Sequence, residues 1–463
     1  MADRRWLAQI ASPPLQCVQF ALVDSGNQRI TKAKQLMRVK EISVKKLFGV
    51  FNHSIPLNME ERITIIHGPN GFGKTIMLRM LDGFFNSRYA VWRTTPFEEF
   101  RIDFEDESYV RILPFKNGSD PIVDVYYAEA GSGEKLNQAS LSLAPVPDDA
   151  VRDDAPTDLD AENEEYERGL NKLIAARLAR EKQEVEPEWL CILRKSVNIH
   201  FVSIDRLLKR KVLKNRGDLA GSSSNRPNLE RTVNRYAKGL TEVIQAALAE
   251  YGEVSQALDR TFPARVIKET PAPNFSIREL QQKLRSLEEK RAYLMTAGLL
   301  DNDNPPDGQV PQEIDDRTQS VLSVYVSDTE KKLSVLDNLA DKIDLFKRIV
   351  NQRFPYKKMS IGKERGLVFT TLDDQPLPTA RLSSGEQHEL VLLYESLFTV
   401  KHDSLILIDE PELSLHIAWQ ERFLKDLQEI IKLTPMDFLI ATHSPDIISD
   451  RWDLTVELKG PTQ

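Results

Sequence analysis

The sequence of 463 residues has little of several features that define protein classes. It contains two cysteines, Cys17 and Cys191, which lie far apart and lack the spacing of a metal site. This pattern argues against a disulfide framework or a zinc site, and a reducing cytosol fits it. An apolar run of about 18 residues is also missing, as is the apolar core of a signal peptide at the start. We therefore expect a cytoplasmic protein that does not bind a membrane.

Positive charge is not in excess either. The chain has 62 Lys and Arg against 70 Asp and Glu, which gives a formal net charge of −8. Such a balance argues against a nucleic-acid coat over the whole surface, although a local basic groove would still allow DNA binding. The candidates for such a groove are residues 45–51 (KKLFGVF) and 209–216 (KRKVLKNR).

Hydrophobic patterning divides the chain into parts with different character. Residues near the start show no clear period, and either Met1 or Met37 would serve as the native start. Strand-like runs and an apolar helix follow, then a region of successive helices, then alternating helices and strands. The predicted parts are an N-terminal tail (1–36), a first lobe of an α/β head (37–205), a helical arm (206–355) and a second lobe (356–463).

Two segments interrupt this pattern. Residues 144–188 begin rich in Pro and Asp and become a charged helix, which we interpret as an acidic surface insertion, with a partner-docking element as the alternative. Residues 301–311 (DNDNPPDGQVP) break the arm, and we expect them to form the tip of an antiparallel helical hairpin. Heptads do not persist for long, so the sequence favours a short arm over a long coiled coil.

The segment GPNGFGKT, residues 68–75, matches the phosphate-binding pattern G-x-x-x-x-G-K-[ST], known as Walker A. It follows a predicted strand and opens a predicted helix, which is the context that this pattern requires. Glycines let backbone N–H groups turn inward around the phosphates, and the helix N-terminus adds partial positive charge. Lys74 would reach the β- and γ-phosphates of ATP, and the Thr75 hydroxyl would bind Mg²⁺. The predicted binding residues are Gly68, Asn70, Gly71, Gly73, Lys74 and Thr75.

Two further apolar strands end in reactive side chains. The run SLILIDEPELSLH (404–416) ends its strand in Asp409 and Glu410, the Walker B pattern. Asp409 would hold Mg²⁺, and Glu410 would polarise the attacking water as a general base. The run FLIATHSPDII (438–448) places His443 after its strand, where the imidazole would contact the γ-phosphate and hold the attacking water.

The stretch LSSGEQ, which starts at Leu382, makes the set of motifs more specific. It resembles the L-S-G-G-Q signature of the ABC ATPase superfamily, with Ser384 in place of a glycine and Glu386 in place of the glutamine. Together with DEPELSLH and THSP it is most similar to the soluble group that contains RecF, SMC proteins, OLD-family nucleases and the ATPase subunits of Septu-type antiphage systems. The resemblance covers residues 37–133 and 361–450.

This resemblance implies an α/β fold, an ABC-type P-loop ATPase head. Such a head has a mixed sheet with flanking helices, an antiparallel β subdomain and, here, an inserted helical or short coiled-coil arm. It also implies that two heads clamp two ATP molecules, with Ser383, Ser384 and Gly385 closing on the γ-phosphate held by the other chain. Ser414 would lie in the D-loop, which crosses that interface. Because the chain has a single Walker A segment, we expect a homodimer or a higher homo-oligomer.

The sequence departs from the family pattern in two respects. A glutamine of the Q-loop is not evident, and Glu98 and Glu99 occupy about the right place without a clear match. The chain also ends soon after His443, which leaves no room for the TOPRIM nuclease domain of OLD enzymes. Any nuclease output would then come from another polypeptide.

These observations favour an ATPase that senses or regulates for a separately encoded effector, a nuclease or a toxin, in antiphage defence. The main alternative is a RecF-like, DNA-binding ATPase of repair or recombination. A transporter subunit fits less well, because such subunits place the signature roughly a hundred residues after Walker A, and here the gap is about three times as long. A scaffold that binds ATP and scarcely hydrolyses it is a further alternative, against which the intact Glu410 argues.

Overall fold

The computed structural model describes most of the chain outside the predicted tail and insertions. Ser414, the acidic stretch 144–185 and the basic segment 209–216 lie outside the described residues. The described ranges are 37–117, 120–131, 136–143, 186–202, 229–268, 275–301, 315–413 and 415–460.

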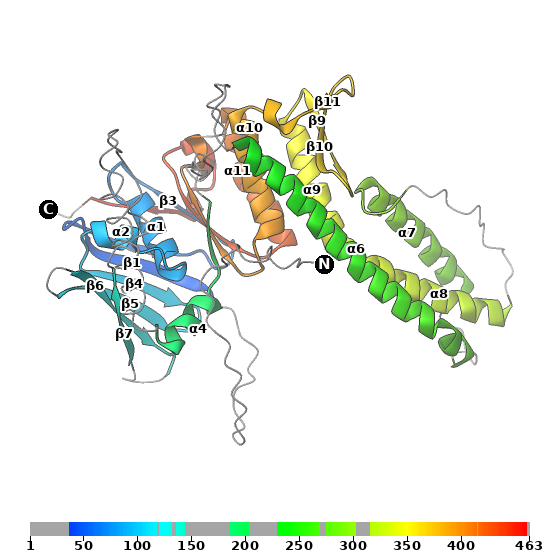
Figure 1. Cartoon of the computed structure of the whole chain (residues 1–463), viewed down its shortest axis with the longest axis horizontal. Helices are drawn as coiled ribbons and strands as arrows, with labels where there is room; N and C mark the ends of the chain where they lie inside the picture. The colour runs from blue at the N-terminus through cyan, green and yellow to red at the C-terminus, as the bar shows by residue number, and fades with distance from the viewer. Residues whose placement is uncertain are drawn as a thin grey trace, which may run out of the picture. The chain divides into compact units, whose positions relative to one another are not determined.

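A parallel sheet of five strands carries the predicted motifs, in the order β14-β3-β13-β12-β8. Its strand β3 is labelled in Figure 1. Strands such as LILID and DFLIA are apolar without alternation, which is the pattern of a strand buried on both faces. The five strands are β3 (Ile63–His67), β8 (Ile199–Val202), β12 (Leu405–Asp409), β13 (Asp437–Ala441) and β14 (Thr455–Glu457).

The two faces of this sheet belong to different hydrophobic clusters. Ile406 and Ile408 enter a cluster with the apolar side chains of α10 and α11. Their neighbours Leu405 and Leu407 enter a second cluster, which contains the apolar side chains of α1. The sheet therefore separates α1 from α10. These helices are α1 (Lys74–Phe85), α10 (Ser384–Tyr394) and α11 (Ile417–Leu433).

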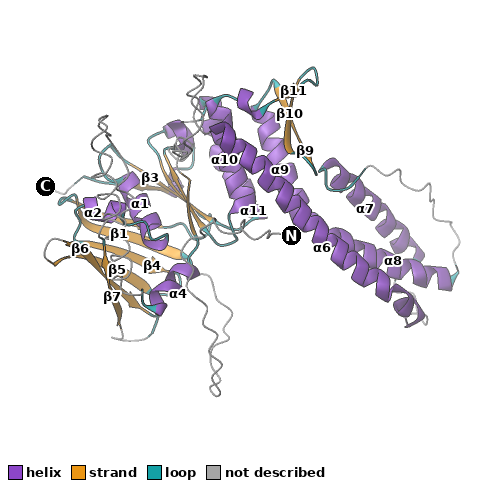
Figure 2. Ribbon diagram, viewed as in Figure 1, coloured by secondary structure: helices purple, strands orange, loops and turns teal. Residues whose placement is uncertain are grey.

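An antiparallel sheet of six strands covers the α1 side, in the order β2-β1-β4-β5-β6-β7 (Figure 2). Its strands alternate buried and exposed residues, and the buried ones, such as Val44 and Phe100, join the cluster that contains α1. The strands are β1 (Val39–Leu47), β2 (Phe51–Pro56), β4 (Glu99–Phe104), β5 (Tyr109–Asn117), β6 (Asp120–Ala128) and β7 (Leu136–Ser142).

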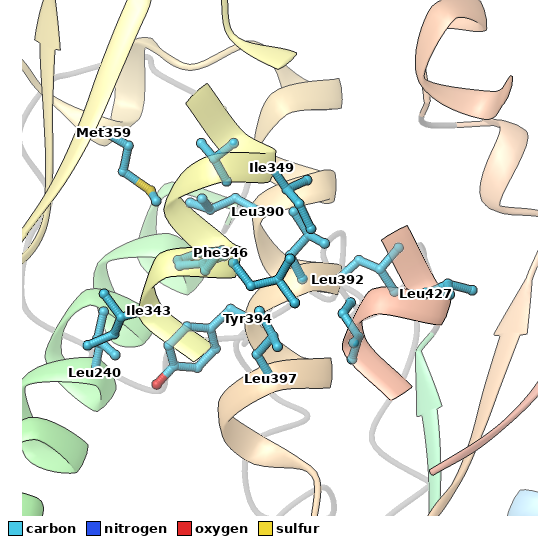
Figure 3. Packing of buried hydrophobic residues seen from close by; sticks show 14 of the residues in the cluster. Leu240, Ile343, Phe346, Ile349, Met359, Leu390, Leu392, Tyr394, Leu397 and Leu427 are labelled. Carbon is cyan, nitrogen blue, oxygen red and sulfur yellow. The ribbon is translucent and has the colours of Figure 1, made fainter. Parts of the chain in front are cut away.

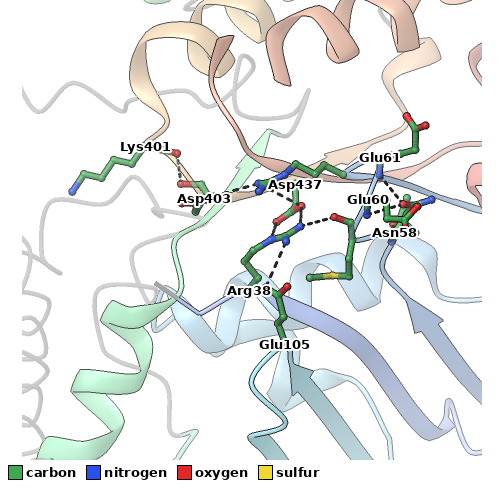
Figure 4. Close-up of polar contacts among 12 residues, drawn as sticks. Arg38, Asn58, Glu60, Glu61, Glu105, Lys401, Asp403 and Asp437 are labelled. Atoms are coloured by element: carbon green, nitrogen blue, oxygen red, sulfur yellow. Dashed lines mark hydrogen bonds and ion pairs between the residues drawn. The ribbon is translucent and has the colours of Figure 1, made fainter. Parts of the chain in front are cut away.

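A half-buried arginine ties the two sheets together at the end where β13 begins (Figure 4). Arg38, next to β1, donates to both carboxylate oxygens of Asp437 at 3.0 and 2.7 Å and to the Met59 carbonyl at 3.1 Å. Two parallel hydrogen bonds to a carboxylate fix direction as well as distance. This contact joins the residue before β1 to the first residue of β13.

The helical arm consists of α6 and three returning helices. Lys332 pairs with Asp259 and Arg265 with Asp328, so α8 runs antiparallel to α6. The long helix α6 begins against the head, where Asn234 accepts a hydrogen bond from Thr379. The arm helices are α6 (Leu229–Lys268), α7 (Ile277–Thr296), α8 (Asp316–Ser334) and α9 (Asp337–Arg353).

The predicted antiparallel hairpin at residues 301–311 is wrong. Lys283 pairs with Glu330 and Lys290 with Asp337, each at 2.7 Å, so residue numbers rise together along α7 and along the α8–α9 pair. The end of α7 accordingly lies beside β9, where the Lys363 ammonium meets Asp301 at 2.8 Å. A break rich in Pro, Gly and Asp looks the same in sequence whether it closes a tight turn or joins opposite ends of two parallel helices.

The arm and the signature helix share one core at the base of the arm (Figure 3). Phe346 and Ile349 of α9 pack with Leu390 of α10 and Leu427 of α11, all of them fully buried. A small antiparallel sheet, ordered β11-β10-β9, lies beside this core. Its strands are β9 (Lys357–Gly362), β10 (Gly366–Thr371) and β11 (Pro376–Leu377).

The predicted α/β head with flanking helices, an antiparallel β part and an inserted helical arm is confirmed; its central sheet is parallel throughout the described strands. None of the described helices has both the length and the apolar composition that crossing a bilayer requires. The remaining short elements are α2 (Ala90–Thr94), α4 (Glu188–Ser196), α12 (Pro445–Ile448), η2 (Thr379–Arg381), η3 (Glu395–Thr399), η4 (Pro411–Leu413) and η5 (Trp452–Leu454).

Two glycines allow the contact between arm and head to be tested. Gly366 has φ of 62°, and a Cβ there would lie 2.0 Å from the Ala237 carbonyl oxygen of α6. Gly366→Ala should lower the free energy of unfolding by about 2 kcal/mol or more, measured in urea. The control is Gly252→Ala in α6, the helix that contains Ala237. A Cβ at Gly252 meets nothing within 4 Å, so this substitution should raise the free energy of unfolding by about 0.5–1 kcal/mol. Equal effects of the two substitutions would contradict this packing.

Candidate active site

The motifs meet because three parallel strands end in one row. Ile66 of β3 pairs with Ala441 of β13, and Ala441 pairs with Asp409 of β12. The residues that follow each strand therefore leave the sheet at the same edge. The phosphate loop begins at Gly68, and His443 follows the central strand of the three, so it comes between the other two motifs. Ligands of open parallel sheets bind outside the carboxyl ends of the strands in this way.

The phosphate loop is held tightly from the side of the antiparallel sheet. Gly73 has φ of 91°, and a Cβ there would lie 2.4 Å from Leu47 Cδ2, so no other residue fits without a shift. A ring nitrogen of His53, Nε2, lies 2.9 Å from the Phe72 carbonyl. At the tip, Asn70 and Gly71 are exposed. The base of the loop is thus fixed, while its tip is open to solvent.

Lys74 is 5% exposed and lies in the middle of the site. Its Nζ donates to the carbonyls of Gly68 at 2.7 Å and Pro69 at 3.1 Å, and it lies 3.4 Å from His443 Nδ1. Burial lowers the pKa of Lys74, against the opposing pull of nearby carboxylates, first of all that of Glu410. An ammonium with loop carbonyls as its main partners is placed to exchange them for the more strongly charged oxygens of a phosphate.

Asp409 and Thr75 face each other across the site. The Thr75 hydroxyl donates to Asp409 Oδ1 at 2.9 Å. Burial, followed by the charge of Glu410, raises the pKa of Asp409 to about 6, although the Thr75 hydrogen bond acts in the opposite direction. Among the described residues no group of three or more His, Cys, Asp or Glu side chains gathers to hold a metal. One carboxylate and one hydroxyl fit Mg²⁺, which takes its other ligands from phosphates and water.

Glu410 has an unusual backbone conformation. Its φ is 48°, in the left-handed region that residues other than glycine rarely adopt. The Glu410 N–H donates to the Ala441 carbonyl at 2.8 Å, which holds this turn in place. As a result its carboxylate lies 3.8 Å from His443 Nε2. Strain of this kind is often kept at functional sites, because it points a side chain where a regular strand end would not.

Sequence reasoning missed two residues that hold His443 in place. Glu412 accepts a hydrogen bond from the His443 N–H at 2.7 Å. Gln420, the second residue, accepts from the Ser444 hydroxyl at 2.7 Å and donates to the Leu415 carbonyl at 3.1 Å. Glu412 belongs to the quoted run DEPELSLH, so its motif was visible, but nothing in the sequence connects it with a loop thirty residues later.

The signature residues lie apart from the phosphate loop. Ser383 is the N-cap of α10, and Ser383 and Ser384 are exposed. Because α10 packs in the cluster on the opposite face of the parallel sheet from α1, the structure does not bring Ser383, Ser384 and Gly385 to Lys74 of the same chain. The predicted D-loop residue Ser414 lies outside the described residues.

Glu98 and Glu99, which stood at about the position of a Q-loop, are not part of the site. Glu99 opens β4 in the antiparallel sheet and pairs with Lys45 and Arg111, each at 2.6 Å. Glu98 pairs with Lys46. The strand that flanks β12 in the parallel sheet is instead β8. The carboxyl end of β8 lies at the same edge of the parallel sheet as the carboxyl end of β12. The residues that follow β8, 203–228, lie outside the described residues.

Comparison with known proteins also indicates an ATPase. Residues 276–448 match a family described as AAA ATPase domain, a span that includes α10, Asp409 and His443 but fewer than half of the residues. Among curated proteins, the spermidine/putrescine import ATP-binding protein PotA of Mycoplasma genitalium is 22% identical over 422 residues, which cover 86% of this chain and 70% of that protein. With the phosphate loop and the strand order, these matches support an ABC-type P-loop ATPase.

Two solved structures of SMC head domains also resemble this chain. One, from Pyrococcus furiosus, has an extended coiled coil and is bound to the C-terminal domain of ScpA; it is 13% identical, with a TM-score of 0.37, and the match covers 92% of this chain and 95% of that one. The other is bound to the C-winged helix domain of ScpA, at 11% identity and a TM-score of 0.33, covering 89% and 91%. Both TM-scores are low, so the architecture rests on the strand order described above.

The raised pKa of Asp409 predicts a cost in stability. Its folded-state pKa of about 6 exceeds the ordinary 3.8, so the carboxyl destabilises the fold above pH 6 and ceases to do so near pH 4. In protein free of metal and nucleotide, Asp409→Asn should raise the free energy of unfolding by about 2–3 kcal/mol at pH 7.5 and leave it unchanged at pH 4. Urea unfolding at both pH values measures this, and a variant less stable than wild type at pH 7.5 would contradict it.

Proposed function

We propose that the protein is an ATP-hydrolysing ATPase whose nucleotide sites form between two copies of the chain. The observation that carries this proposal is the placement of the phosphate loop and the signature helix on opposite faces of one sheet. The chain has one of each, so a loop can be completed by a signature only if the signature belongs to another copy. Exposure of Asn70 at the loop tip and of Ser383 at the start of α10 supports this arrangement.

The roles of the residues follow from their contacts. Lys74 would bind the β- and γ-phosphates of ATP, and Thr75 and Asp409 would hold Mg²⁺. ATP supplies the phosphoanhydride bond that is cleaved. Glu410 would accept a proton from the attacking water, and His443 would position that water, since the Glu410 carboxylate lies 3.8 Å from its Nε2. Glu412 keeps His443 in place through its backbone N–H.

Apolar side chains beside the predicted D-loop support the dimer. Leu413 is 72% exposed and Ile417 is 64% exposed, on either side of Ser414. Exposed large apolar side chains next to an active site are typical of a surface that another protein covers. In the proposed dimer they would contact the second copy, together with Ser414, Ser383, Ser384 and Gly385.

We further propose that the dimer reports its ATP state to a separately encoded effector, a nuclease or toxin, in antiphage defence. The motif set LSSGEQ, DEPELSLH and THSP supports this role, as does an arm joined through one core to the signature helix. Purification from the native host followed by identification of the co-purifying chain tests it. Recovery of the ATPase with replication and repair proteins, and with no toxic effector, would contradict it.

The alternative is a RecF-like DNA clamp, which would bind DNA through a basic surface. Of its two basic candidates, residues 209–216 lie outside the described part of the chain. In the other, Lys45 is paired with Glu99 and Lys46 with Glu98, so both charges are already compensated. DNA affinity that falls steeply with salt would restore this alternative.

Glu410→Gln should trap a dimer in the presence of ATP and Mg²⁺. The amide keeps the shape of the side chain but cannot accept the proton of water, so hydrolysis stops while binding continues. Light scattering after size exclusion should show twice the monomer mass with ATP only. Lys74→Ala, added to the same protein, should abolish both ATP binding and the dimer. A Glu410→Gln protein that remains monomeric with bound ATP would overturn the proposed arrangement.

Ser383→Arg should separate hydrolysis from binding. The substitution alters only the residue supplied by the second copy, so each chain keeps its own Lys74 and binds ATP within about threefold of the wild-type Kd, while the rate of hydrolysis falls by about 100-fold or more. Fluorescent-nucleotide titration measures the first quantity and phosphate release the second. If Ser383→Arg hydrolyses ATP at the wild-type rate, the signature is not part of the nucleotide site.

A further inference from the structure

The junction between α9 and β9 contacts the signature helix through two cations. Lys357, the first residue of β9, pairs with Glu386 of α10, its Nζ lying 2.8 and 2.5 Å from the two carboxylate oxygens. Arg353, the last residue of α9, forms an ion pair with Glu389 one turn further along α10. Arg353 is 6% exposed and Glu389 is 1% exposed, so this second contact is part of the core.

Hydrogen bonds across the junction hold Lys357 close to the end of α9. The Asn351 side chain donates to the Met359 carbonyl at 3.1 Å and accepts from the Met359 N–H at 2.6 Å. The Lys357 N–H donates to the Phe354 carbonyl at 3.0 Å. The start of β9 is therefore tied to the end of α9, and we expect a displacement of the arm's last helix to move Lys357.

Glu386 connects Lys357 to the first residue of the signature helix. Its carboxylate accepts from the Ser383 N–H at 2.6 Å, and the Ser383 hydroxyl accepts from the Glu386 N–H at 3.3 Å, a reciprocal capping box. Burial raises the pKa of Glu386, but the hydrogen bonds from Lys357 and Ser383 outweigh burial and hold the pKa below its usual range. The Glu386 side chain is thus ionised. It lies three residues from Ser383, which in the proposed function contacts a phosphate.

A carboxylate at this place poses an electrostatic problem. In a partly desolvated interface a negative charge repels a nearby polyphosphate strongly, because screening by water is reduced. The superfamily pattern has a neutral glutamine here, whereas this chain has Glu386. The Lys357 ammonium, with a side chain only 21% exposed, supplies the compensating positive charge. Of the described residues, Lys357 is the only one for which an ion pair with Glu386 is seen.

We propose that Lys357 is a positioning residue for ATP hydrolysis: it neutralises Glu386 and holds Ser383 in the geometry that receives the phosphate of a second copy. This rests on the proposed function. The same contact would connect the arm to the active site, because α9 ends at Arg353 and β9 begins at Lys357. A partner that moves α9 would change the charge and the position of the signature together.

The test is a charge-rescue series. Lys357→Met should leave the affinity of a single head for ATP within about twofold, because Lys74 binds it, and should lower the rate of hydrolysis about tenfold or more, because it leaves an unpaired carboxylate at the interface. Lys357→Met combined with Glu386→Gln should recover hydrolysis to within about threefold of wild type, since the amide oxygen still accepts from the Ser383 N–H without the charge. Lys357→Arg should also retain activity.

The matched control is Lys358→Met, which removes a neighbouring, exposed lysine of the same strand and should leave hydrolysis unchanged. Circular dichroism and nucleotide affinity verify that each variant is folded. A Lys357→Met protein with the wild-type rate of hydrolysis overturns the proposal. So does a double variant as slow as the single one, because loss of activity would then come from lost structure and not from the uncompensated charge.

These outcomes differ from a failure of the proposed function. If Glu410→Gln never dimerises with ATP, the shared site itself is wrong. If that dimer forms and Lys357→Met still hydrolyses ATP normally, the shared site stands and only the role of Lys357 is lost.

Discussion

The register of three parallel strands is the constraint on which the site depends. Because Ile66, Ala441 and Asp409 lie in one row, the phosphate loop, His443 and the acids after β12 leave the sheet at the same edge. The same sheet has two buried faces, and alternate residues of each strand place α1 on one and α10 on the other. One pairing pattern therefore assembles half of a nucleotide site and keeps the chain's own signature away from it.

Charge distribution in the site follows from that assembly. Lys74 is buried beside Asp409, Glu410 and Glu412, and burial lowers the pKa of Lys74 while it raises that of Asp409 to about 6. Both side chains are thus held in an environment that disfavours their charged forms. Ligands of opposite charge, a polyphosphate for Lys74 and a divalent cation for Asp409, would relieve this cost. Such a site sacrifices stability in the free protein for affinity, as functional sites commonly do.

Much of the head could be predicted from sequence, because its motifs are local. A glycine-rich loop between a strand and a helix, and acids after an apolar strand, each carry their meaning within about ten residues. The parallel order of α7 and α8 could not be predicted, because it depends on pairs such as Lys283 with Glu330, nearly fifty positions apart. The partners of Glu99 and the contacts of Glu412 and Lys357 were hidden for the same reason.

Mixing two inactive variants tests the central claim, that each site is shared between two chains, most directly. Lys74→Ala removes ATP binding, and Ser383→Arg blocks the signature, so each protein alone should be inactive. In a mixed dimer one site combines the intact Lys74 of one chain with the intact Ser383 of the other. The account predicts that an equal mixture recovers hydrolysis, toward about a quarter of the wild-type rate when the chains exchange freely. A mixture as inactive as its two components, although mixed dimers are shown to form, would contradict it.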